Sequence, residues 1–139
     1  MFRQILIPTD FTKKNINPLE IATSLATKYK GVIHLLHVVE IIADTTFEEY
    51  EDFYNKLEKR AQKQMNVLIA SYQGKGIQIT PHITYGNRVE EIIKFINENR
   101  IDLVIMNSHK VEIKNPAQSW GTISYRVALL SNCPIMLAK

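Results

Sequence analysis

Short apolar runs alternate along the chain with longer segments of helical periodicity. The apolar runs predict β-strands at residues 3–9, 32–39, 77–85, 101–106 and 133–138. The run IDLVIM at 101–106 is apolar at almost every position, which indicates a strand buried on both faces of a sheet. The run at 77–85 contains Pro81, which has no N–H for the ladder and therefore predicts an edge strand.

The segments between these runs repeat their apolar residues at helical spacing. In the first, Asn17 stands before Pro18, a pattern that predicts an N-cap followed by proline at the first helical position. The longest segment, 47–73, is acidic at its start and basic later, an order that complements the helix dipole. Two further helices are predicted around Val89 and Ile123.

This alternation of strands and helices predicts an α/β fold. Strand–helix–strand connections are right-handed and give a parallel sheet covered by helices on both faces. We therefore expect a Rossmann-like three-layer sandwich with five parallel strands. The 139 residues suit a single domain, 1–139.

Composition and charge narrow the classes of function. Apolar residues make up 45% and charged residues 22%, as in ordinary soluble globular proteins. No apolar run approaches the ~20 residues of a membrane span, so we expect no membrane partner. Cys133 is the single cysteine, which indicates a reduced, cytoplasmic protein. The net charge of +3 comes from basic residues beside acidic ones, so we expect a solvated surface rather than a nucleic-acid surface.

Open α/β sheets bind ligands beyond the carboxyl ends of their strands, where the strand order reverses. The start of the last helix adds N–H groups that suit a phosphate. The candidate site residues at these positions are Pro8, Thr9, Asp10, Val38, Asn107, Ser108, His109, Lys110, Gly121, Thr122 and Ile123. Asp10 and Thr122 could equally be turn and cap residues.

Several stretches carry a resemblance to a known family. ILIPTDFT near the start, LLHVVE, YGN, DLVIMNSHK, WGTIS and the final NCPIMLAK together resemble the universal stress protein family over essentially the whole chain. The resemblance implies the strand order 3-2-1-4-5 and a homodimer paired through the last strand, Pro134 to Ala138. It also implies that Asp10 contacts adenine or ribose and that Pro8, Thr9 and Val38 wall the base pocket.

The family includes members that bind ATP or a related nucleotide and members that do not. Nucleotide binders typically show G-x-x-G, nine residues and then G-[ST]. Here Asn107 and Lys110 replace the first two glycines, and ten residues separate Lys110 from the matching Gly121-Thr122. Glycine lets backbone amides close on a phosphate, so these replacements weaken such a loop, although the Lys110 ammonium could meet a phosphate instead.

Two interpretations remain open on the sequence. In the first, a stress-response dimer acts through protein partners, and its nucleotide cleft is degenerate. In the second, the cleft binds ATP or AMP, with Mg²⁺, as a sensor with little or no hydrolysis.

We expect no enzyme: Ser108 and His109 lie side by side in MNSHK, which is not a G-x-S-x-G elbow, and no clustered residues have metal-ligand spacing. His34, His37 and His82 lie on strand patterns and are predicted to be structural.

Overall fold

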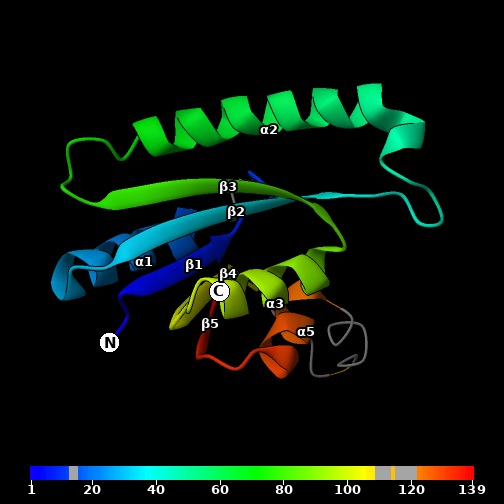
Figure 1. Ribbon diagram of the computed structural model, residues 1–139. Helices are drawn as coiled ribbons and strands as arrows, with labels where there is room; N and C mark the ends of the chain where they lie inside the picture. Colours follow the sequence, from blue (N-terminus) through cyan, green and yellow to red (C-terminus); the bar gives the residue numbers. More distant parts are fainter. Residues whose placement is uncertain (13–15, 109–113, 115–121) are drawn as a thin grey trace.

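A computed structural model describes residues 1–12, 16–108, 114 and 122–139. Within these residues the chain forms one parallel five-stranded sheet in the order β3-β2-β1-β4-β5 (Figure 1). The strands are β1 (Gln4–Pro8), β2 (Val32–Glu40), β3 (Gln78–Gly86), β4 (Leu103–Asn107) and β5 (Ile135–Ala138). The predicted fold class and strand order are confirmed. β3 lies at one edge, as Pro81 predicted.

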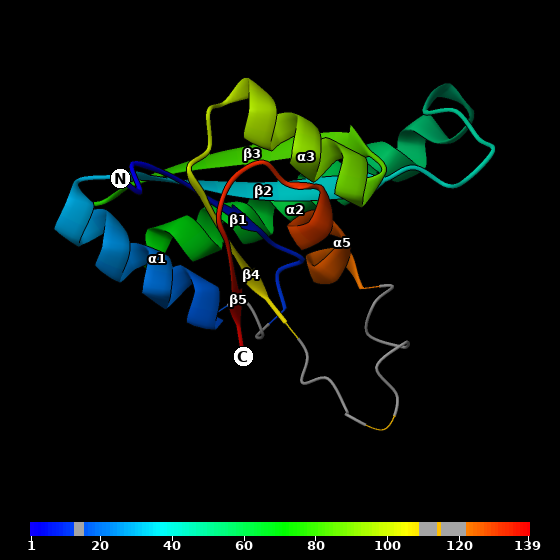
Figure 2. The ribbon, with the colours of Figure 1, turned by 90° about the horizontal axis from the view of Figure 1, so that it is seen from below.

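Helices cover both faces of this sheet. They are α1 (Ile16–Tyr29), α2 (Glu51–Ala70), α3 (Arg88–Glu98) and α5 (Ile123–Leu130), with a short 3₁₀ turn η2 (Glu48–Tyr50) before α2. Figures 1 and 2 show α2 on one side of the strands and α3 and α5 on the other. The reason is topological, because right-handed crossovers that run toward β3 and those that run toward β5 place their helices on opposite faces.

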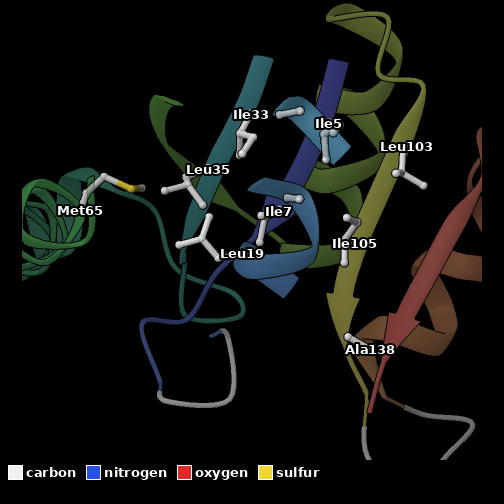
Figure 3. Close-up of a cluster of buried hydrophobic side chains, with 11 residues drawn as sticks. Ile5, Ile7, Leu19, Ile33, Leu35, Met65, Leu103, Ile105 and Ala138 are labelled. Atoms are coloured by element: carbon white, nitrogen blue, oxygen red, sulfur yellow. The ribbon is translucent and has the colours of Figure 1, made fainter. Parts of the chain in front are cut away.

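Alternate side chains of the central strands enter two separate cores. On one face Ile7 and Leu35 pack with Leu19 of α1 and Met65 of α2, and Figure 3 shows Met65 reaching toward Leu35. On the other face the strand residues pack against α3 and α5. The residues of this second core include Leu6, Leu36, Val38, Ile92 and Val127. This twofold alternation explains why the central runs are continuously apolar.

Two helix boundaries differ from the sequence prediction. α1 begins at Ile16, so Asn17 lies inside its first turn and is not the cap. The Asn17 side-chain amide instead donates to the Lys139 carbonyl oxygen at 3.3 Å. The segment 47–73 is also not one helix, because Tyr50 has a non-helical backbone (φ −131°, ψ 34°) that separates η2 from α2.

Among the described residues, no helix is both long and apolar enough to cross a membrane.

Two of the three strand histidines form a hydrogen-bonded chain across the sheet. His34 Nε2 lies 2.7 Å from Gln4 Oε1, and His34 Nδ1 lies 3.0 Å from His82 Nε2. A neutral His34 that donates to Gln4 must accept from His82 at Nδ1. Burial lowers the pKa of both rings, and the neighbouring His82 lowers the pKa of His34 further. These contacts give His34 and His82 the structural role that was predicted.

We expect acid to destabilise the protein through this pair. Because the folded state lowers both pKa values, it resists protonation, so stability is complete above the unfolded pKa near 6.5 and falls as the pH drops below that value. Urea unfolding at pH 8, 7, 6 and 5 measures this loss. A variant carrying His34→Gln and His82→Gln should lose less stability over the same interval; equal losses in the two proteins would contradict the prediction.

Candidate functional site

The candidate site lies at the carboxyl edge of the sheet, where the strand order reverses between β1 and β4. Both strands are parallel, and Leu6 is paired with Val104. Three residues further along each strand come Thr9 and Asn107, so the two chain segments leave the sheet at the same level. β2 extends further, since Pro8 is paired with Leu36 and Val38 lies two residues beyond. The predicted residues of all three strands therefore meet at one edge.

The turn after β1 is held by its own side chains. The Thr9 N–H donates to the Leu36 carbonyl oxygen at 2.8 Å, and Thr9 Oγ1 accepts from the Phe11 N–H at 3.0 Å. Asp10 is exposed, and its Oδ1 accepts from the N–H and the hydroxyl of Thr12 at 2.9 and 2.7 Å. This is an Asx turn, the local role that the sequence left open for Asp10. Its nucleotide role stays a prediction.

Phe11 and His37 complete this turn and were not among the predicted site residues. Phe11 has a left-handed backbone (φ 64°), which is unusual for a bulky residue. Its ring packs on that of His37, with centroids 4.6 Å apart. His37 Nδ1 donates to the Thr9 carbonyl oxygen at 2.8 Å. Burial is the main cause that lowers the pKa of His37, so this ring supports the turn as a neutral group.

The end of β4 is joined to the end of the chain. The Ser108 N–H donates to the Ala138 carbonyl oxygen at 2.8 Å. Lys139 Nζ donates to Ser108 Oγ at 3.2 Å, which brings an ammonium group to the edge of the site. Sequence reasoning missed Lys139, because its proximity to Ser108 follows from the pairing of β5 with β4. Asn107, the last residue of β4, is half-buried.

Thr122 forms the N-cap of α5. Its backbone is extended (φ −69°, ψ 152°), and its Oγ1 accepts from the Tyr125 N–H at 3.4 Å. Ile123 begins the helix and packs against the core on the α3 side. The cap role foreseen for Thr122 is confirmed. His109, Lys110 and Gly121 lie outside the described residues, so the phosphate role of Lys110 and Gly121 and the position of His109 near a ligand stay predictions.

The described residues at this edge carry hydroxyl, ammonium and helix N-terminal groups, which are types of group that bind polar or anionic ligands in proteins. Hydroxyls of Thr9, Ser108 and Thr122, the ammonium of Lys139 and the N-terminus of α5 belong to the loops and ends at the carboxyl edge. Among the described residues, no group of three or more histidine, cysteine, aspartate or glutamate side chains is placed to hold a metal ion.

A doubly wound parallel sheet with its polar loops at the switch point defines a class of small α/β proteins that bind ligands at that edge. The family model described as the Universal stress protein family matches residues 1–139. The chain belongs to the universal stress protein family, as the resemblance implied.

Individual relatives agree with this assignment. The universal stress protein MJ0577 of Methanocaldococcus jannaschii is 28% identical to this chain, over 100% of the chain and 96% of the relative. A solved structure of MJ0577 superposes with a TM-score of 0.82 at 27% identity, covering 100% and 96% of the two chains. A universal stress protein from Archaeoglobus fulgidus, solved in complex with dAMP, shares the fold (TM-score 0.70, 15% identity, 100% of both chains). So does a universal stress protein solved in complex with cAMP (TM-score 0.65, 13% identity, 99% and 96% covered).

Proposed function

We propose that this universal stress protein is a single-domain regulatory module of the stress response, which forms a homodimer through β5 and acts on protein partners. In this proposal the cleft at the carboxyl edge binds nucleotides weakly and catalyses no reaction. The proposal rests above all on the uncovered edge at β5.

β5 is the last strand of the sheet, so among the described residues one side of its backbone lacks a neighbouring strand. Such an edge is a template for pairing with another chain. Met136 is 36% exposed on this strand. α5, the helix that leads into β5, ends in Leu129 and Leu130, which are 69% and 59% exposed. An exposed apolar side chain on an open strand edge is typical of a protein–protein interface.

The cleft itself favours weak nucleotide binding. Asp10, the residue expected to contact adenine or ribose, holds its own turn through Thr12. Asn107 and Lys110 stand where nucleotide-binding members of the family have glycines. A side chain at such positions hinders the approach of backbone amides to a phosphate.

Two measurements on the purified protein test the proposal. Sedimentation velocity reports the oligomeric state, and calorimetry with ATP, ADP and AMP, with and without Mg²⁺, reports nucleotide affinity. We expect a dimer, no nucleotide released from the purified protein, and Kd values on the order of 1 mM or weaker. A monomer would refute the interface, and a micromolar Kd would refute the degenerate cleft.

A second candidate function is an adenine-nucleotide sensor. It is favoured by one observation, namely that Thr9, Asp10, Ser108 and the Thr122 cap belong to the same edge of the sheet. The family members solved with dAMP and cAMP support it, because they show that this fold can hold an adenine nucleotide. The calorimetry above separates the two candidates.

If the sensor function holds, Thr122→Ala should weaken AMP binding. Loss of the hydrogen bond from the Thr122 hydroxyl to a phosphate is expected to raise the Kd about 5- to 10-fold. Loss of the N-cap should lower the unfolding free energy by about 1 kcal/mol. Calorimetry and urea unfolding measure the two effects. Asn87→Ala provides the control, since it removes the N-cap of α3, whose side chain accepts from the Glu90 N–H. Equal AMP affinity in both variants would exclude Thr122 from the site.

A further inference from the structure

A pocket of about 450 Å³ lies between α1 and α2, next to the turn after β1. α1 and α2 cover the face of the sheet opposite α5, so this pocket lies on the other side of the sheet from α5, and Thr9 belongs both to its lining and to the candidate site described above. Its described lining consists of Thr9, Phe11, Thr12, Ile16, Leu19, Lys63, Gln64, Val67, Leu68 and Tyr72.

The walls of the pocket are mostly apolar. Leu19, which is 1% exposed, packs in the core and also lines the pocket, and Leu68 and Phe11 pack partly buried against the same core. Ile16 and Val67 are 52% and 72% exposed, so apolar side chains also line the parts of the pocket that are open to water. A concave apolar space of this size lies within the ~300–1,000 Å³ range of small-molecule sites.

The charge of the lining is one-sided. Lys63 is the charged residue among the described lining residues, and within the described part of the chain it forms no salt bridge. Tyr72 has charges of both signs near it: burial and then the charge of Glu20 raise the pKa of its hydroxyl, and Lys75 Nζ lies 4.8 Å from the centroid of its ring. Lys63 lies within α2, whereas Tyr72 lies after the end of that helix. Lys63 is therefore the group among these lining residues that favours an anionic head group.

We propose that this pocket binds a small amphipathic carboxylate. Its apolar chain lies against Phe11, Leu19 and Leu68, and its carboxylate meets the Lys63 ammonium. The Gln64 amide supplies a further polar group on the wall. Burial of the apolar chain provides the affinity, and the Lys63 ammonium selects the sign of the head group.

Titration with decanoate, followed by the amide signals of isotope-labelled protein, tests the proposal directly. We expect saturable binding with a Kd on the order of 0.1 mM. The affected signals should be those of residues 9–12 and 63–68. Absence of saturable binding, or shifts confined to Asn107, Ser108 and Thr122, would overturn the proposal.

Variants at Lys63 show whether the charge acts as proposed. Lys63→Gln should weaken decanoate about 5- to 10-fold and leave binding of the uncharged 1-decanol unchanged. Lys63→Glu should weaken decanoate further and strengthen decylamine, a reversal that damage to the fold would not produce. Lys59→Gln is the matched control, because Lys59 is exposed one turn earlier on α2 and does not line the pocket. Equal decanoate affinity in all these variants would refute the role of Lys63.

Discussion

Met136→Lys is expected to convert the protein from a dimer into a monomer. Met136 lies on β5, at the open edge of the sheet, and is 36% exposed. A lysine there would bring a charge into an apolar contact between two strand edges, and natural proteins use edge lysines to prevent such pairing. We expect the dimer Kd to rise about 100-fold or more, equivalent to about 2.7 kcal/mol. Sedimentation velocity over a range of concentrations measures it.

Ile42→Lys is the matched control for this experiment. Ile42 is also apolar and 48% exposed, but it follows β2 rather than β5. The control should remain a dimer and show the same circular dichroism spectrum as the unchanged protein. If Met136→Lys and Ile42→Lys dimerise equally well, β5 is not the interface.

Tyr54→Ala should be the most destabilising single change considered. The Tyr54 side chain is fully buried, and its ring stacks on Phe47 with centroids 5.6 Å apart. Its hydroxyl oxygen accepts from the Ile42 N–H at 2.8 Å, which fastens the segment after β2 onto α2. Removing a buried aromatic ring costs about 3–5 kcal/mol of unfolding free energy. Urea unfolding measures this loss.

Tyr54→Phe separates the ring from the hydroxyl. It keeps the packing and leaves the Ile42 N–H without its partner, so we expect a loss of about 1 kcal/mol. Tyr85→Phe, which also removes only a hydroxyl, provides a comparison for Tyr54→Phe. The Tyr85 hydroxyl donates to Glu58 Oε2 at 2.5 Å, and burial, followed by Glu58, raises the pKa of Tyr85 to about 12. A loss for Tyr54→Ala no larger than that for Tyr54→Phe would contradict the packing argument.

Much of the fold could be predicted because apolar periodicity is a local property of the chain. The apolar run at 101–106 predicts a strand buried on both faces, and β4 is buried between two layers of helices. Pro81 marked an edge strand, and β3 is one. Helix starts were harder to predict, since a cap depends on backbone angles that several residue types can adopt. Asn17 had the sequence of a cap, yet α1 begins before it and its amide donates to Lys139.

The general position of the candidate site was predictable because parallel strands have their carboxyl ends at the same edge of the sheet. Thr9, Asp10, Asn107 and Ser108 could therefore be placed together before any contact was known. The partners of these residues could not be predicted. Thr12 engages the Asp10 carboxylate through an Asx turn, which requires a particular backbone path after β1.

The amino-acid pattern alone predicted the alternation of strands and helices, the parallel sheet, the resemblance to the universal stress protein family and the candidate residues at the carboxyl edge. These conclusions depend on periodicity and short motifs, which are properties of residues close together in the sequence. Tertiary packing established the contact of Lys139 with Ser108 and the pairing of His34 with His82, residues 31 and 48 positions apart. It also formed the pocket between α1 and α2, because a cavity depends on the distance between two helices and not on the periodicity of either one.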